Sequence, residues 1–373
     1  MGVHTIVDVG GGRGHLAVAL AHRYGLRVLL LDACPPLAAA ATERAAKLAS
    51  LRRSCPACAH LAVGSVEALA CRLDWGAEGA SPLAALLDER LGSVRVLLVG
   101  LHACGDLTPG LLRAFLTYDA AVAVVALGCC YNLLTDSEQN GDERNAADSV
   151  LEATAMAAAA AALRRGGTGV PAAVINAGCA RSPPGFPLSA HVRSMEPPLR
   201  LCRRGRSLAC QSAARWACGG GAPNAAVQAD TLFRGALEAL RVRFWPRLPA
   251  EALRRVTVAG CGDGKAWGGE AGWAGHARAA LLQAGLTEAE LPSPAFLDCF
   301  WIEQVQPHAH LMLPFMALRA SLAGPLEAAI VLDRLLLLRE AGADAHVLPL
   351  FDAALSPRNL ALICRKRRAG TAY

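Results

Sequence analysis

The chain begins with residues whose types and spacing could bind a nucleoside. Residues 8–14 read Asp-Val-Gly-Gly-Gly-Arg-Gly and follow a short apolar run directly. Glycine lets the backbone turn tightly and lets a ligand approach it closely. A second apolar run ends at Asp32, where an acid can bind a ribose hydroxyl. This order of apolar run, glycine loop, second run and acid predicts a nucleoside-binding site.

The glycine spacing favours one nucleoside cofactor over another. A dinucleotide loop requires the spacing G-x-G-x-x-G, and His15 stands where that pattern would continue. An acid before the first glycine, with G-x-G-x-G spacing, instead fits S-adenosyl-L-methionine, and NAD is the less favoured alternative. Asp8 is predicted to hold the loop and the methionine ammonium. The predicted cofactor-binding residues are Asp8, Gly10, Gly12, Gly14, Asp32 and Leu101.

Polar residues follow two later apolar runs. Residues 101–106 read Leu-His-Ala-Cys-Gly-Asp, and residues 128–132 read Gly-Cys-Cys-Tyr-Asn. In doubly wound sheets ligands bind outside the carboxyl ends of the strands, so both segments should meet beside the cofactor. Such groups can orient a nucleophile or accept its proton. The predicted catalytic residues are His102, Asp106, Tyr131 and Asn132.

The same two segments contain a possible metal-binding set. His102, Cys104, Cys129 and Cys130 provide one nitrogen and three sulfur donors, as zinc prefers. Neighbouring cysteines rarely both point at one ion, however, and buried cysteine is a common small hydrophobe. We therefore expect no metal and keep these four residues as the alternative set.

Apolar runs alternate with helical segments, which predicts an α/β fold with parallel strands joined by crossovers. The expected strands are residues 4–9, 27–32, 94–99 and 120–127, with helices near 15–24, 36–53 and 111–117. Near the end of the chain, a helix over 325–340 precedes a predicted hairpin of residues 346–352 and 360–364. Such a hairpin closes a doubly wound, Rossmann-like sheet of the methyltransferase type, mainly parallel.

The two ends of the chain should therefore build one sheet. We predict a discontinuous domain of residues 1–135 and 320–368, interrupted by a mostly helical or irregular insertion over 136–319. Within the insertion, helices are expected at Ala153–Leu163 and Asp230–Phe244 because the first is rich in alanine and the second is amphipathic. The insertion is a candidate surface for a substrate or partner.

Composition excludes some classes of protein. Of 373 residues, 54% are hydrophobic and 18% charged, which excludes wholesale disorder. No long apolar stretch is free of charges and turn residues, and no signal peptide is visible, so we expect no membrane and an intracellular location, cytoplasmic or nuclear. The 14 cysteines are then expected to be reduced. A net charge of +6 permits an RNA partner, and the oligomeric state stays open.

The motifs resemble the methyltransferase-like twenty-five family, also labelled ribosomal RNA adenine dimethylase domain-containing. The similar blocks are residues 8–16, 100–107, 128–135, 185–189, 208–211 with Trp216, 349–352 and 356–361. The resemblance implies an S-adenosylmethionine-dependent methyltransferase. A smaller likeness, limited to His102–Gly105 and Cys129–Cys130, is to the transfer RNA ribose methyltransferases that act on the acceptor stem.

Two departures from that family affect the functional prediction. The helical segment that usually precedes the first strand is absent, which puts activity of this chain in question. The Asn/Asp-Pro-Pro-Tyr/Phe motif of amino-directed adenine methyltransferases is also absent, which disfavours adenine dimethylation. We expect a methyltransferase with RNA as the favoured acceptor and protein as the second. The alternative is a catalytically inactive module with this fold that binds RNA or a protein partner.

Overall fold

The computed structural model describes residues 2–54, 64–73, 82–135, 184–211, 225–249, 252–253, 272–353, 355–356 and 358–367. The chain divides into two compact units. The first contains residues 1–211 and 323–373, and the second contains residues 212–322.

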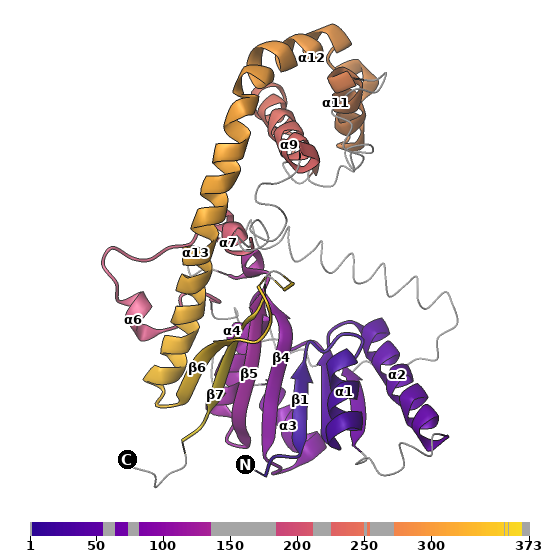
Figure 1. Cartoon of the computed structure of the whole chain (residues 1–373), viewed down its shortest axis with the longest axis vertical. Coiled ribbons are helices and arrows are strands. Elements are labelled where there is room, and N and C mark those ends of the chain that lie inside the picture. Colours follow the sequence, from indigo (N-terminus) through magenta and orange to yellow (C-terminus); the bar gives the residue numbers. More distant parts are fainter. Residues whose placement is uncertain are drawn as a thin grey trace. The chain divides into compact units, whose positions relative to one another are not determined.

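The described part of the first unit contains a seven-stranded sheet with the order β3-β2-β1-β4-β5-β7-β6 (Figure 1). All neighbouring strands are parallel except β7, which is antiparallel to both β5 and β6. The strands are β1 (Thr5–Val9), β2 (Arg27–Asp32), β3 (Ser65–Ala70), β4 (Val96–Cys104), β5 (Ala121–Cys129), β6 (Asp344–Pro349) and β7 (Leu360–Arg365). This topology confirms the predicted doubly wound, mainly parallel fold with a closing hairpin.

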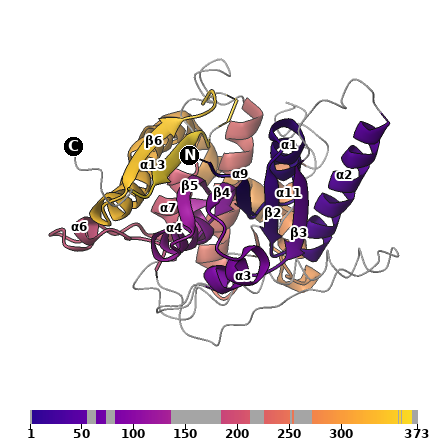
Figure 2. The same ribbon diagram turned by 90° about the horizontal axis from the view of Figure 1, so that it is seen from below.

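Helices cover both faces of this sheet, as Figure 2 shows from below. Alternate residues of a strand point to opposite faces. Ile6 of β1 therefore packs with α1 (His15–Tyr24) and α2 (Pro35–Arg53). Its neighbour Val7 packs with α3 (Pro82–Leu91), α4 (Leu107–Thr117) and the last turns of α13 (Met312–Glu340). Burial on both faces explains why every residue of β1 is buried.

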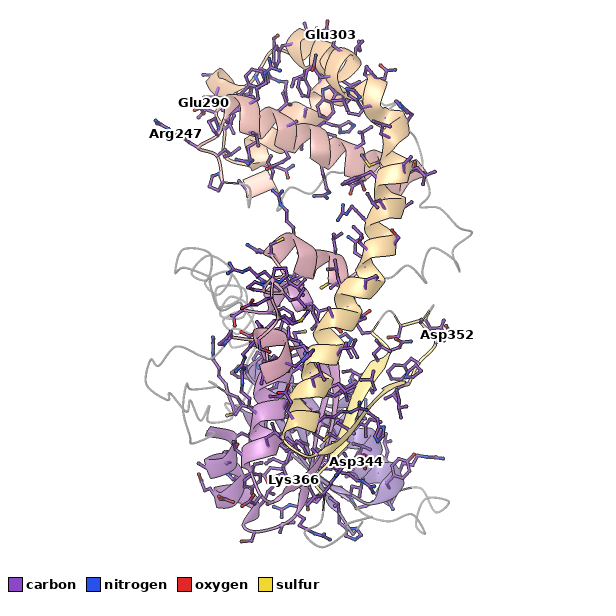
Figure 3. All side chains as sticks on the ribbon, turned by 90° about the vertical axis from the view of Figure 1, so that its left-hand side faces the viewer. Arg247, Glu290, Glu303, Asp344, Asp352 and Lys366 are labelled. Atoms are coloured by element: carbon purple, nitrogen blue, oxygen red, sulfur yellow. The ribbon has the colours of Figure 1, made fainter. Side chains whose placement is uncertain are left out.

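The closing hairpin is held by polar contacts at its open end. Nε of Arg365 donates to the carboxylate of Asp344 over 2.7 Å, which joins β7 to β6. Nζ of Lys366 donates to the carbonyl oxygen of Tyr118 over 2.7 Å and so ties the end of β7 to the turn before β5. Figure 3 labels Asp344 and Lys366 at this end of the sheet.

A segment far along the chain also belongs to the first unit. Residues 184–211 include the short helices α6 (Ala190–Arg193) and α7 (Arg203–Ala209). The buried carboxylate of Asp333 on α13 accepts hydrogen bonds from the backbone of Leu188 and from the backbone and hydroxyl of Ser189, at 2.7–2.9 Å. Phe186 packs with Tyr131 and Ile330. These contacts attach this segment to the first unit, which extends to Gln211 before it resumes at Ala323. The bounds of the predicted insertion, residues 136–319, stay a prediction.

The described part of the second unit is helical. It contains α9 (Ala225–Phe244), α11 (Gly272–Gln283), α12 (Pro294–Phe300), a π-helical turn (Trp301–Val305), a 3-10 segment (Gln306–Leu311) and the start of α13. Its core centres on Trp273, which meets Phe233 edge-on at 5.1 Å and donates from Nε1 to the carbonyl oxygen of Leu297 over 2.8 Å. The predicted helix Asp230–Phe244 is confirmed within α9. The predicted helix Ala153–Leu163 lies outside the described residues.

Several elements differ from their predicted bounds. β4 continues to Cys104 and β5 continues to Cys129. His102, Cys104 and Cys129 therefore lie at the ends of strands and not in the loops that follow them. β3 and α3 were not predicted at all. α13 begins at Met312 and runs through Pro325, whereas the spacing of apolar residues predicted a start at that proline.

One helical run in the described residues, Pro294–Glu340, is long and apolar enough by length and composition to cross a membrane. Its most apolar window has a mean hydropathy of 1.5 and is 22% buried. The charge and turn residues within it, including Arg319 and Pro325, are the reason that no span was predicted.

Candidate functional site

The glycine loop joins β1 to α1 and has the backbone conformation that its glycines permit. Gly10, Gly12 and Gly14 have φ values of 74°, 56° and 72°, a region that favours glycine. A Cβ atom at Gly10 would lie 2.9 Å from Leu107, and one at Gly14 would lie 2.7 Å from Cβ of Ala41. At Gly12 no atom of the described residues lies within 4 Å of that position, so the loop is open there on the side of the described chain.

The acid at the end of β2 holds this loop. Oδ2 of Asp32 accepts a hydrogen bond from the backbone nitrogen of Gly12 at 2.8 Å, and Oδ1 accepts one from Cys34 at 2.9 Å. Asp32 is half-buried. The structure thus brings two of the predicted cofactor-binding residues into contact.

Asp8 lies buried beneath the loop with an exposed fraction of 1%. Its Oδ2 has no hydrogen-bond partner among the described residues. Burial, followed by repulsion from the Asp32 carboxylate, raises the pKa of Asp8 from 3.8 to about 7. A cation bound near the loop would satisfy that oxygen and favour the ionised carboxylate.

The ends of β4 and β5 bring together four further side chains, which we call the His–Cys cluster: His102, Cys104, Cys129 and Cys130. Nδ1 of His102 lies 3.1 Å from Sγ of Cys129. The sulfur–sulfur distances are 3.6 Å for Cys104–Cys129, 3.4 Å for Cys104–Cys130 and 3.3 Å for Cys129–Cys130. The sequence predicted that these two segments meet, and they do.

The cluster shifts the pKa values of its thiols in opposite directions. Hydrogen bonds from Cys104, then from Cys130 and His102, lower the pKa of Cys129 to about 5 against the effect of burial. The hydrogen bond to Cys129 and burial raise the pKa of Cys104. The described contacts therefore favour one thiolate, on Cys129.

The remaining predicted catalytic residues lie in structural contacts. Tyr131 is buried, and its hydroxyl donates to Oε1 of Glu327 at 3.0 Å. Burial raises the pKa of Tyr131, so its hydroxyl stays protonated at neutral pH. Oδ1 of Asp106 accepts from the backbone of Thr135, and Oδ1 of Asn132 accepts from the thiol of Cys210. The catalytic roles of Asp106, Tyr131 and Asn132 stay predictions. The buried hydrogen bond of Tyr131 to Glu327 does not favour such a role for Tyr131.

A pocket of about 240 Å³, here called the rim pocket, lies beside the cluster. It is lined by Leu101, His102, Leu127, Cys129, Phe351, Ser356 and Arg358. The first four come from the ends of β4 and β5, and the last three come from the loop between β6 and β7. Those three were not predicted as site residues, although they lie within or beside two of the sequence blocks that carry the family resemblance.

Arg358 is fixed where it lines the rim pocket. Its Nη1 forms an ion pair with Oε1 of Glu327 at 2.8 Å, and both side chains are largely buried. Its guanidinium also lies 5.3 Å from the centre of the Tyr131 ring. Tyr131 and Glu327 thus position a cationic group at the pocket.

Comparison with known proteins agrees with this geometry. Residues 1–137 match a family described as a methyltransferase domain. The chain is 26% identical over 276 residues to the probable methyltransferase-like protein 25 of Mus musculus, covering 73% of this chain and 38% of that protein. The Homo sapiens protein of the same name is 26% identical over 276 residues, covering 73% of this chain and 37% of its own.

A solved structure, the apo form of the S-adenosylmethionine-dependent methyltransferase SibL, is 23% identical. The match covers 40% of this chain and 37% of the SibL chain, with a TM-score of 0.22.

The chain spans less than two fifths of the length of the two curated relatives, the mouse and human proteins, that it matches. The resemblance to methyltransferase-like proteins is confirmed, and the adenine dimethylase label stays a prediction. The methyltransferase-domain match covers strands β1–β5, which hold the glycine loop and the His–Cys cluster.

Proposed function

We propose that this chain is an S-adenosylmethionine-dependent methyltransferase whose acceptor is RNA. The observation that carries the proposal is the hydrogen bond from the backbone of Gly12 to Asp32, which holds an open glycine loop at the carboxyl ends of β1 and β2. Ligands of doubly wound sheets bind at these strand ends. The methyltransferase-domain match over the same strands supports it.

The residues around the loop fit this cofactor. S-adenosylmethionine has a ribose and an ammonium group, and it supplies an electrophilic methyl on its sulfonium. Asp32 is the acid for the ribose hydroxyls, because each of its oxygens accepts one backbone hydrogen bond and keeps a further lone pair. The buried Oδ2 of Asp8, unpartnered among the described residues, provides a negative charge for the cationic part.

The acceptor is assigned to the rim pocket. Methyl transfer to a nucleophile depends mainly on alignment, because attack on the sulfonium methyl is in line. His102 lines the pocket, and Arg358 is fixed there by Glu327. An arginine that is held in place suits a phosphate or another anionic group of the acceptor.

RNA is the favoured acceptor because of the net charge of +6 and the arginine at the pocket. Protein is the second acceptor class. The rival proposal is a catalytically inactive module that uses the same fold to bind RNA or a protein partner.

Calorimetry with S-adenosylmethionine tests the cofactor. We expect binding by the full chain, loss of binding in Asp8→Ala and Asp32→Ala, and unchanged binding in Asp119→Asn, an acid whose side chain is fully exposed. No binding by the correctly folded chain would reject the enzyme and favour the inactive module.

A second experiment identifies the acceptor class. The chain is incubated with tritiated S-adenosylmethionine and either total RNA or total protein. Label in RNA that is reduced in Arg358→Ala supports the proposal. Label confined to protein would replace RNA by a protein acceptor.

A further inference from the structure

Backbone strain in the described residues coincides with the His–Cys cluster. Apart from glycines, His102 and Cys130 are the two described residues with positive φ, at 133° and 48°. Such conformations are energetically costly for residues other than glycine and persist where function or surrounding structure requires them. Both residues point a potential ligand atom into the same cluster, so the strain falls where ligand atoms converge.

An irregularity in strand pairing directs His102 toward the cysteines. Gly100 pairs with Ala126 and Ala103 pairs with Gly128, so two residues of β4 stand opposite one residue of β5. This β-bulge contains Leu101 and His102. A bulge re-aims the side chain that it carries. Immediately after it, Cys104 and Cys129 are register partners on adjacent strands.

The distances suit a single ion. The ligand atoms of His102, Cys104 and Cys129 lie within 4.8 Å of one another. The sulfur of Cys130 lies within 3.4 Å of the other two sulfurs but outside this group of three, so it must approach His102 for all four residues to bind one ion. A zinc–sulfur bond is about 2.3 Å long, so an ion bound to all three sulfurs would sit about 1 Å above the plane of their triangle.

We propose that His102, Cys104, Cys129 and Cys130 form a zinc site at the carboxyl ends of β4 and β5. The donor set of three thiolates and one imidazole is one that structural zinc sites use, and it favours zinc over hard cations such as magnesium. When Cys130 joins the other three residues, the ion has four protein ligands and no open position, so the proposed role is structural.

Simple thiol packing and a disulfide both fit the cluster less well than a metal ion. Packed thiols behave as small hydrophobes, but such packing requires neither the strained His102 backbone nor the approach of its Nδ1 to a sulfur. A disulfide would join two of the three sulfur atoms and leave the third sulfur and His102 without a function. All three are free cysteines, outside any disulfide, in the structure.

The zinc site would join the two strand ends that line the rim pocket. His102 and Cys129 belong both to the cluster and to the pocket wall. A bound ion would therefore fix the bulge of β4 against β5 and hold one wall of the pocket in shape. His102 then acts as a positioning residue and not as a base, because its Nδ1 is directed into the cluster.

Elemental analysis of the full chain, purified without added chelator, tests this proposal. We expect about one zinc per chain, as for structural zinc sites in general. Cys104→Ser and Cys129→Ser should lose most of it. Cys202→Ser is the matched control, because this exposed cysteine caps α7 through Gly205, and serine caps helices as well. Zinc loss in all three variants would overturn the proposal.

Cobalt(II) substitution provides a readout that does not depend on the folding of the variants. Cobalt added to the zinc-depleted wild-type chain should give the visible absorption of tetrahedral thiolate ligation, and zinc should displace it. A chain with no zinc and no cobalt spectrum, or with a disulfide among the three cysteines by mass spectrometry, would reject the site. Neither measurement involves S-adenosylmethionine, so failure here is separate from failure of the proposed function.

Discussion

The backbone nitrogen of Gly12 donates to Oδ2 of Asp32 over 2.8 Å, across twenty positions of the chain. The hydrogen bond fixes the glycine loop to the end of the neighbouring strand. Asp32→Ala leaves the nitrogens of Gly12 and Cys34 without this acceptor, so it should lower the free energy of unfolding by about 1–3 kcal/mol. Urea denaturation measures this loss, and an unchanged midpoint would contradict it.

Gly12 and Gly14 should respond differently to the same substitution. Gly14→Ala places a Cβ 2.7 Å from Ala41 as well as straining φ, so it should reduce stability more than Gly12→Ala does. The Cβ of Gly12→Ala meets no atom of the described part of the chain within 4 Å, so the loss of stability should be limited to the backbone strain of about 1–2 kcal/mol. It should nevertheless weaken S-adenosylmethionine binding at least about tenfold, equal to about 1.4 kcal/mol. Thermal melts and calorimetry separate the two effects, and wild-type affinity in folded Gly12→Ala would count against the proposed cofactor position.

Asp8 should make stability depend on pH. Its pKa is raised from 3.8 to about 7, so the folded chain holds a proton that the unfolded chain has released between those values. Stability should therefore fall as pH rises from about 4 to about 7 and change no further from this group above that. Asp8→Asn cannot ionise, so it should be similar in stability to the wild type at pH 4 and more stable at pH 8. The difference in the free energy of unfolding at pH 8 should be at most about 1.4 kcal/mol for each unit by which the pKa of Asp8 is raised. Denaturation at both pH values tests this, and parallel profiles would refute it.

Binding of a cation beside Asp8 should release the same proton. Calorimetry near pH 6, in two buffers with different ionisation enthalpies, should show proton release when S-adenosylmethionine binds to the wild-type chain. The Asp8→Asn variant, if it binds at all, should show none from this group. Equal release in both would place the ammonium elsewhere.

Tyr131 should act through its contact with Glu327 and not through proton transfer. Tyr131→Phe removes a hydrogen bond from a largely buried carboxylate, and should cost about 1–3 kcal/mol of stability. Methyl transfer at a temperature where the variant stays folded should be reduced only modestly, without a change in the shape of its pH profile. A large loss of transfer at unchanged stability would instead support the predicted catalytic role.

Asp333 should be essential for the contact between α13 and residues 184–193. Its carboxylate accepts three hydrogen bonds while buried, and Asp333→Asn replaces one acceptor oxygen by a donor. We expect a loss of about 2–4 kcal/mol in urea denaturation. Glu340→Gln is the comparison, because Glu340 accepts two backbone hydrogen bonds of the same segment in an exposed position. Its loss should be clearly smaller, and equal losses would show that burial does not decide the effect.

Strands with strong apolar runs could be predicted, and weakly patterned elements could not. β1, β2 and the closing hairpin are short apolar runs with turn residues around them, so their existence and type followed from the residues. β3 was missed because its sequence, Ser-Val-Glu-Ala-Leu-Ala, lies half-buried at an edge and alternates weakly. The start of α13 was misplaced because a proline was taken as its first turn, whereas the helix continues through it.

For the candidate site, the sequence located the strand ends but not the side-chain contacts. That segments 101–106 and 128–132 meet followed from parallel pairing. The direction of the His102 side chain could not be predicted, because it depends on a β-bulge that no residue type in this segment indicates. The burial of Tyr131 depends on Glu327 and Arg358, which are distant in sequence, so no local pattern could reveal it.

The position of β7 in the sheet has a consequence for biosynthesis. β7 is inserted between β5 and β6, yet its residues are made about 230 positions after β5. At about 5–20 residues per second, β5 waits on the ribosome for roughly 10–50 s with one edge unpaired. An unpaired, apolar strand edge is a template for pairing with other chains. Nascent chains of this protein that stall before β7 should therefore depend on chaperones to escape aggregation.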